Sequence, residues 1–190
     1  MFNISEIPKH GRNALFIRHS ERFHLGQGEF GIGVPLTENG KKTAEQMGKI
    51  IREQGYRLNH IFASPTVRTL QTAHHIALGY GEKINIIPEG ILMGKDLYVI
   101  DPEEASQTPV KGYELFIRYA RGEKFPGWGD INTANRKLDC FLNINSQEGL
   151  NIFVSHDYII AIFMYFKLKK FPSQENWLNF LDGININYDD

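Results

Sequence analysis

The distribution of apolar residues along the chain is the feature that most restricts its fold. Short apolar runs of strand length are separated by longer amphipathic stretches, and this alternation is typical of an α/β domain with a mainly parallel sheet. The runs lack strict apolar and polar alternation, which indicates strands that are covered on both faces. We predict such strands at 13–18, 59–64, 84–88 and 150–155.

Two of the amphipathic stretches carry clear signals for the ends of helices. Thr37 is a candidate N-cap for a helix that ends at Gly55, because a threonine hydroxyl accepts a hydrogen bond from a free backbone N–H. The second helix is predicted to have Ser64 as its N-cap, Pro65 at its first position and Gly79 as its stop.

The remaining chain contains a region rich in glycine and proline, at about 89–130. Such a density of helix and strand breakers indicates an excursion that covers or shapes a site. One helix is predicted inside it, at 113–121, and two follow it, at 132–147 and 157–168. The tail after 176 suggests a short helix and then an edge strand.

Composition limits the domain count and the partners. With 190 residues, of which 42% are apolar, the chain is predicted to form one domain, 1–190, with 89–130 as a variable insertion that shapes the substrate site. The formal net charge of -1 argues against binding to nucleic acid or to an anionic membrane. Cys140 is the single cysteine, which excludes an intramolecular disulfide, and we expect it on an apolar helix face.

The sequence also bears on location. The first residues lack an apolar core of signal-peptide length, and the longest apolar run, 158–166, is too short to span a bilayer. We therefore expect a cytoplasmic protein.

Charged and titratable residues follow three of the predicted strands. In an open parallel sheet, functional groups gather beyond the carboxyl ends of the strands, so these segments are expected to converge. The residues concerned are Arg18, His19, Arg22, Arg68, His156 and Asp157. Guanidinium groups present planar donors that match phosphate oxygens and stay charged, so this set predicts a phosphate pocket.

Four motifs, in this order along the chain, resemble those of a known family. They are "IRHSER", "PLTENGKKTAEQMG", "ASPTVRTLQTA" and "VSHD". Together they are similar to the motifs of the histidine phosphatase superfamily, which includes phosphoglycerate mutase-like and acid phosphatase-like proteins. The resemblance implies a phosphoglycerate mutase-like fold, a three-layer α/β/α sandwich with a mainly parallel central sheet.

The same resemblance implies roles for individual residues. His19 would be the nucleophile that becomes phosphorylated, with Arg18, Arg68 and His156 around the phosphoryl group. Arg22 stands where the acid phosphatase branch has an extra arginine, and His156 with Asp157 matches the His-Asp pair of that branch.

The chain also departs from the family pattern. Ser20 replaces the glycine of the Arg-His-Gly signature, and the Trp-Asn continuation of the phosphoglycerate mutases is absent. The second departure argues against mutase activity.

Phosphoryl transfer mainly requires positioning and positive charge, so three arginines suffice without a metal or other cofactor. His19 must attack as a neutral imidazole, and we expect nearby guanidinium charges to lower its pKa. The leaving alkoxide needs a proton donor. Asp157 is the first choice for this acid and Glu89 the alternative, since mutase-like members take it from the segment after the third strand.

These features predict a metal-independent phosphatase that hydrolyses phosphomonoesters through phospho-His19. A phosphoglycerate-type mutase and a non-catalytic phosphate-binding or interaction module are the alternatives. The substrate would be a small phosphorylated molecule or a phosphoprotein, with selective contacts from 89–130. The basic residues of that region do not choose among substrates: Lys95, Lys111, Arg118, Arg121 and Lys124.

Overall fold

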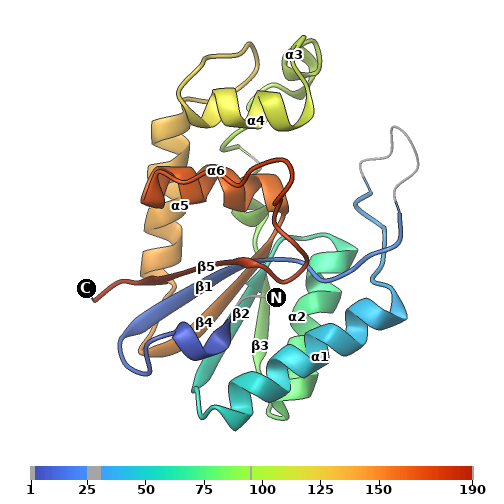
Figure 1. Ribbon diagram of the computed structural model, residues 1–190, viewed down its shortest axis with the longest axis vertical. Helices are drawn as coiled ribbons and strands as arrows, with labels where there is room; N and C mark the ends of the chain where they lie inside the picture. Colours follow the sequence, from blue (N-terminus) through green and yellow to red (C-terminus); the bar gives the residue numbers. More distant parts are fainter. Residues whose placement is uncertain (1–2, 25–30, 95, 190) are drawn as a thin grey trace.

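The computed structural model describes residues 3–24, 31–94 and 96–189, and it has a central sheet with helices on both faces (Figure 1). The five strands are β1 (Arg12–Arg18), β2 (Leu58–Ala63), β3 (Asn85–Pro88), β4 (Gly149–Ser155) and β5 (Gly183–Asn187). Their order in the sheet is β3-β2-β4-β1-β5. All neighbouring pairs are parallel except β1 and β5, which confirms the mainly parallel sheet.

The helices fall into two layers. The α-helices are α1 (Glu38–Glu53), α2 (Val67–Tyr80), α3 (Pro102–Ser106), α4 (Gly112–Ala120), α5 (Ile131–Ile144) and α6 (Asp157–Leu168), and the 3-10 helices are η1 (Ile4–Glu6) and η2 (Gly90–Met93). In Figure 1, α1 and α2 lie on one side of the sheet, and α4 lies beyond α6, away from the strands. No helix among the described residues has the length and apolar character needed to cross a membrane.

The packing of strand β1 explains why its apolar and polar residues do not alternate in the sequence. Successive side chains of a strand point to opposite faces, and here both faces are covered. Ala14 and Phe16 pack with residues of α4, α5 and α6, whereas Leu15 and Ile17 pack with α1 and α2. All four side chains are fully buried, so the sheet is the middle layer of the predicted three-layer sandwich.

Helix α1 begins where the sequence predicted. The Thr37 hydroxyl accepts a hydrogen bond of 2.9 Å from the Gly40 N–H, which satisfies one of the free donors of the first turn.

Helix α2 differs from the prediction at both ends. Its N-cap is Thr66 rather than Ser64, so Pro65 precedes the helix, and Gly79 lies inside it. The helix ends at Tyr80, and its C-cap is Gly81, whose φ of 80° is the left-handed conformation that glycine adopts without strain. Gly79 serves instead as a contact point, because a Cβ there would overlap the backbone carbonyl of Glu45 on α1.

Two further expectations were wrong. Cys140 lies on α5 but is exposed, because the buried face of that helix passes through Ala134, Leu138 and Leu142. The tail forms the predicted edge strand β5, but the chain before it is not helical. Its Leu178 carbonyl accepts a hydrogen bond from Arg18 instead of closing a helical turn.

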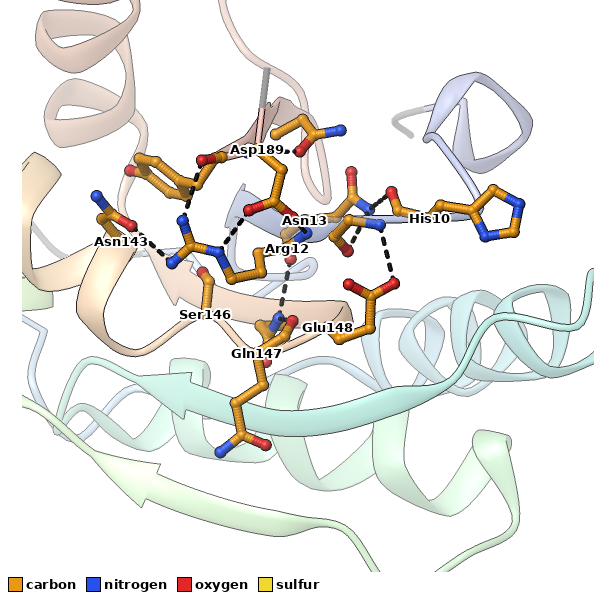
Figure 2. Close-up of polar contacts among 12 residues, drawn as sticks. His10, Arg12, Asn13, Asn143, Ser146, Gln147, Glu148 and Asp189 are labelled. Carbon is orange, nitrogen blue, oxygen red and sulfur yellow. Dashed lines mark hydrogen bonds and ion pairs between the residues drawn. The ribbon is translucent and has the colours of Figure 1, made fainter.

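The far end of the sheet is held by Arg12, at the start of β1 (Figure 2). Its Nε lies 2.7 Å from Asp189 Oδ1, and its Nη1 donates to Asn143 Oδ1 at 3.1 Å. These contacts tie the C-terminal segment and the end of α5 to β1, at the opposite end of the strand from Arg18.

Replacing Gly79 with alanine tests the close packing of α1 and α2. Alanine favours a helix by about 1 kcal/mol over glycine, but its methyl group would push the two backbones apart, and overpacking costs about 1–3 kcal/mol or more. We expect Gly79→Ala to lower the free energy of unfolding by about 2 kcal/mol in urea denaturation. Gly90→Ala is the control, since nothing lies within 4 Å of a Cβ at Gly90. Equal stability of Gly79→Ala and the wild type would contradict the contact.

Candidate functional site

Three chain segments meet beyond the carboxyl ends of β1, β2 and β4. These strands are parallel neighbours, so the residues after each of them lie at one edge of the sheet. A cavity of about 590 Å³ opens there. It is lined by Arg18, His19, Arg22, Ile32, Thr66, Arg68, Met93, Val99, Leu115, Phe116, Trp128, His156, Asp157 and Tyr158. The structure thus brings six of the predicted site residues together, and Glu89 does not line this cavity.

His19 lines the cavity and is almost completely buried, with only 3% of its surface exposed. Its Nδ1 lies 2.7 Å from the Ser20 carbonyl oxygen, and because a carbonyl only accepts, Nδ1 carries the proton. Nε2 then keeps its lone pair in the neutral ring. His19 is therefore held in the tautomer that can attack through Nε2.

Burial is the main reason that His19 is neutral. It lowers the pKa of the imidazole to about 2, and the charges of Arg68 and Arg18 act in the same direction. The sequence predicted the direction but attributed it to the arginines alone. Removal of the ring from water contributes more, because a charged imidazole loses its hydration there.

The second imidazole, His156, is held from both sides. Arg68 Nη2 donates to its Nδ1 at 3.2 Å, so Nε2 carries the proton and donates to Ser64 Oγ at 2.9 Å. Burial, followed by the charge of Arg68, lowers the pKa of His156 to about 3. Ser64 was predicted as a helix cap, and its hydroxyl instead orients this ring.

Backbone carbonyls and a carboxylate fix the arginines. Arg68 Nη1 donates to the Gly31 carbonyl, and Arg18 Nη2 lies 2.9 Å from Asp157 Oδ2. Burial lowers the pKa of both guanidinium groups, but arginine starts so high that both remain charged. Arg22 is half-buried and donates to the Phe23 carbonyl at 2.8 Å.

The structure accommodates Ser20 in place of the signature glycine. Ser20 is fully buried, and its hydroxyl donates to the Gly40 carbonyl at 2.7 Å. Its backbone N–H donates to Thr72 Oγ1 at 2.9 Å. The added hydroxyl therefore has a partner, and the turn after His19 is fastened to both α1 and α2.

The two candidate acids differ in position. Asp157 lines the cavity, and besides Arg18 it accepts a hydrogen bond of 3.1 Å from Trp177 Nε1. Glu89 precedes η2, and its backbone N–H donates to the Ala63 carbonyl at 2.8 Å.

Sequence reasoning also missed several residues around the imidazoles. The Phe180 ring lies 5.8 Å from that of His19 and 4.5 Å from the Arg18 guanidinium carbon. The ring of Tyr158 stacks on His156 with centroids 6.4 Å apart. Tyr158 directly follows the His-Asp pair in sequence, whereas no pattern in the tail pointed to Phe180.

The chemistry available here is that of an anion site. Within residues 3–24, 31–94 and 96–189, no group of three or more His, Cys, Asp or Glu side chains could hold a metal ion. Three guanidinium groups and two neutral imidazoles instead face one cavity, which suits a phosphate dianion beside a nitrogen nucleophile.

Comparisons with known proteins agree with this geometry. Residues 14–180 match the model of the histidine phosphatase superfamily (branch 1). Human 6-phosphofructo-2-kinase/fructose-2,6-bisphosphatase 3 is 24% identical over 183 residues, covering 94% of this chain but 34% of its own length. The chain thus spans about a third of that relative.

Solved structures show the same fold. Phosphoglycerate mutase from Bacillus anthracis str. Sterne superposes with a TM-score of 0.60 at 13% identity, covering 95% of this chain and 89% of its own. Bacillus stearothermophilus YhfR gives 0.54 at 18% identity, covering 90% and 87%.

The buried imidazoles should make stability depend on pH. In the unfolded chain histidine has a pKa of about 6.5, well above the lowered value of His156 in the folded protein. The unfolded state therefore binds more protons below pH 6.5, and the free energy of unfolding falls as the pH falls. We expect His156→Gln to reduce this slope between pH 6 and 4.5 by up to about 1.4 kcal/mol per pH unit.

Urea denaturation at several pH values measures the slope. Glutamine is chosen because its amide can accept from Arg68 and donate to Ser64. His74→Gln is the control, because His74 is exposed. The same slope in His156→Gln and wild type would contradict a neutral, buried His156.

Proposed function

The chain belongs to the histidine phosphatase superfamily, and from that premise we propose that it is a metal-independent phosphatase that hydrolyses phosphomonoesters through phospho-His19. The observation that carries the proposal is the state of His19. Its ring is buried, its Nδ1 proton is engaged by the Ser20 carbonyl, and its lowered pKa leaves Nε2 unprotonated. A nucleophile in that state, facing three guanidinium groups, suits in-line attack on phosphorus.

We propose the following course for the reaction. His19 Nε2 attacks the phosphorus atom, and the bond from phosphorus to the ester oxygen breaks as the alkoxide leaves with a proton from a carboxylic acid. Arg18, Arg22 and Arg68 hold the other phosphoryl oxygens, where positive charge stabilises the transition state. The Nε2–H of His156, which donates to Ser64 Oγ in this structure, would turn to donate to one of these oxygens. Water then attacks phospho-His19, the carboxylate takes a proton from that water, and inorganic phosphate leaves with the neutral ring restored.

Asp157 remains the first choice for the acid and Glu89 the alternative. Asp157 is favoured because its side chain lines the cavity. Arg18 and Trp177 both contact Oδ2 of Asp157 and fix the position of that carboxyl group in the cavity wall.

A further part of the proposal concerns the domain around the site and the wall that contacts the substrate. We propose that residues 1–190 act as one cytoplasmic domain, with 89–130 contributing the substrate-selective wall. This is supported by the helices α3 and α4 within that region and by its five side chains in the cavity lining, which are Met93, Val99, Leu115, Phe116 and Trp128. The substrate would be a small phosphorylated molecule, since only 3% of the surface of His19 is exposed.

Phosphate release from a panel of phosphomonoesters, with EDTA present, tests the reaction. We expect the wild type to release phosphate and His19→Ala to lose activity by about a thousandfold or more, because the attacking nitrogen is gone. His74→Ala is the control, an exposed histidine outside the cavity. Undiminished release by folded His19→Ala would contradict the proposal, and recovery of a phosphate isomer in place of free phosphate would support a mutase.

Substrates with different leaving groups distinguish the two acids. An alkoxide needs a proton, whereas nitrophenolate is stable without one, so loss of the acid should affect alkyl phosphates most. We expect Asp157→Asn to lower kcat for an alkyl phosphate by about 10²–10⁴-fold and to lower it much less for nitrophenyl phosphate. If Glu89→Gln gives this pattern and Asp157→Asn does not, the assignment to Asp157 is wrong.

A further inference from the structure

We infer that the site selects phosphomonoesters whose leaving alcohol is uncharged and largely apolar, an inference that rests on the proposed function. The cavity has two chemically distinct parts. All of its charged and imidazole groups belong to the catalytic and phosphate-binding residues already proposed, which are Arg18, His19, Arg22, Arg68, His156 and Asp157. The rest of the described lining is apolar except for Thr66 and Tyr158.

The apolar part is contributed mainly by the region 89–130. Met93 is the last residue of η2, Val99 forms an isolated β-bridge with Trp128, and Phe116 lies on α4. The Tyr158 hydroxyl lies 3.4 Å from the Met93 carbonyl and donates to it, so it is directed to the backbone. Thr66 Oγ1 lies 2.8 Å from Thr69 Oγ1. Trp128 Nε1 is buried, and none of the described residues accepts a hydrogen bond from it. A leaving group that extends from the phosphate therefore meets mainly carbon atoms.

The basic residues of the same region are occupied or placed elsewhere. Lys111 donates to the Ser106 carbonyl at 2.7 Å, and Arg118 is paired with Glu114 and Glu123. Arg121 and Lys124 are exposed and do not line the cavity, and Lys95 lies outside the described residues. Within the described lining, no cation remains to neutralise a second phosphate or a carboxylate on the substrate.

The shape of the wall suits a carbon chain or a ring. The ring of Phe116 stacks on Tyr158 with centroids 5.0 Å apart and an angle of 17° between the planes. Trp128 stands at 62° to Phe116 and packs on Tyr119, with centroids 4.8 Å apart. Since these rings already hold one another, the surface is formed before the ligand arrives, which lowers the entropy cost of binding. A cavity of about 590 Å³ is in the usual size range for small-molecule sites.

Binding and turnover of a homologous ester series test the inference. Ethyl, butyl and hexyl phosphate and 2-phenylethyl phosphate have similar alkoxide leaving groups, so differences among them report contacts rather than leaving-group chemistry. We expect kcat/KM to rise about fourfold for each methylene buried until the wall is covered. Glycerol 3-phosphate, 3-phosphoglycerate and fructose 1,6-bisphosphate should fall at least about tenfold below butyl phosphate, because a polar or charged group would be buried without a partner.

Variants locate the effect. Phe116→Ala should reduce the ratio of kcat/KM for hexyl phosphate to that for ethyl phosphate by about tenfold. If Phe116→Ala does not fold, the smaller change Val99→Ala serves in its place, and we expect it to reduce the same ratio by about threefold. The control is Ile100→Ala, a neighbour of Val99 that is 61% exposed and does not line the cavity; its ratio should match the wild type.

Calorimetric binding of the same esters to His19→Ala separates the inference from the proposed catalysis, because that variant cannot form phosphohistidine. Affinity that rises with chain length supports the apolar wall even if the wild type turns over none of the esters, in which case the proposed function alone fails. Affinity that is flat along the series, or higher for 3-phosphoglycerate or the bisphosphate than for butyl phosphate, overturns the inference.

Discussion

The parallel pairing of β4 with β1 on one side and β2 on the other is the constraint on which the site depends. The pairing of β1 with β4 ends at Arg18 and Ser155, but the backbone hydrogen bonds continue beyond it. The His19 N–H donates to the Ser155 carbonyl at 3.0 Å, and the Ser64 N–H donates to the Val154 carbonyl at 3.0 Å. The chain segments that carry His19 and Ser64, the partner of His156, are thus extensions of the sheet, and their positions follow from the strand register.

Burial then sets the chemistry of these segments. The charges of nearby arginines lower the pKa of both histidine rings, but removal of the rings from water lowers it further. His19 Nδ1 donates to the Ser20 carbonyl, and both ring nitrogens of His156 have partners, in Arg68 and Ser64. These hydrogen bonds offset part of the cost of burying the two rings, and the site is both buried and rich in positive charge.

Much of this arrangement could be predicted from the sequence. The strands, the Thr37 cap and the meeting of Arg18, Arg68 and His156 at one edge follow from local patterns, because apolar periodicity and strand ends are encoded within short stretches. Contacts between distant segments could not be predicted in the same way. Gly79 has the local signature of a helix stop, but its role depends on Glu45 of another helix.

Contacts between distant segments also explain the other differences between the sequence prediction and the structure. Ser64 precedes a proline and a helix, as a cap would, yet its hydroxyl bonds a ring 92 positions away. The tail has helical periodicity, but Leu178 uses its carbonyl for Arg18. The apolar character of the cavity lining from 89–130 was hidden too, because the sequence shows Lys111 and Arg118 but not their contacts with Ser106, Glu114 and Glu123.

The most direct test of the account is to trap the covalent intermediate. Wild-type protein would be mixed with nitrophenyl phosphate, quenched in alkali within milliseconds, and digested for mass spectrometry under conditions that preserve phosphohistidine. We expect a phosphoryl group on the peptide that contains His19, formed at least as fast as free phosphate appears and absent from His19→Ala. Phosphate release without any phosphorylated protein, or a phosphoryl group on a different side chain, would contradict it.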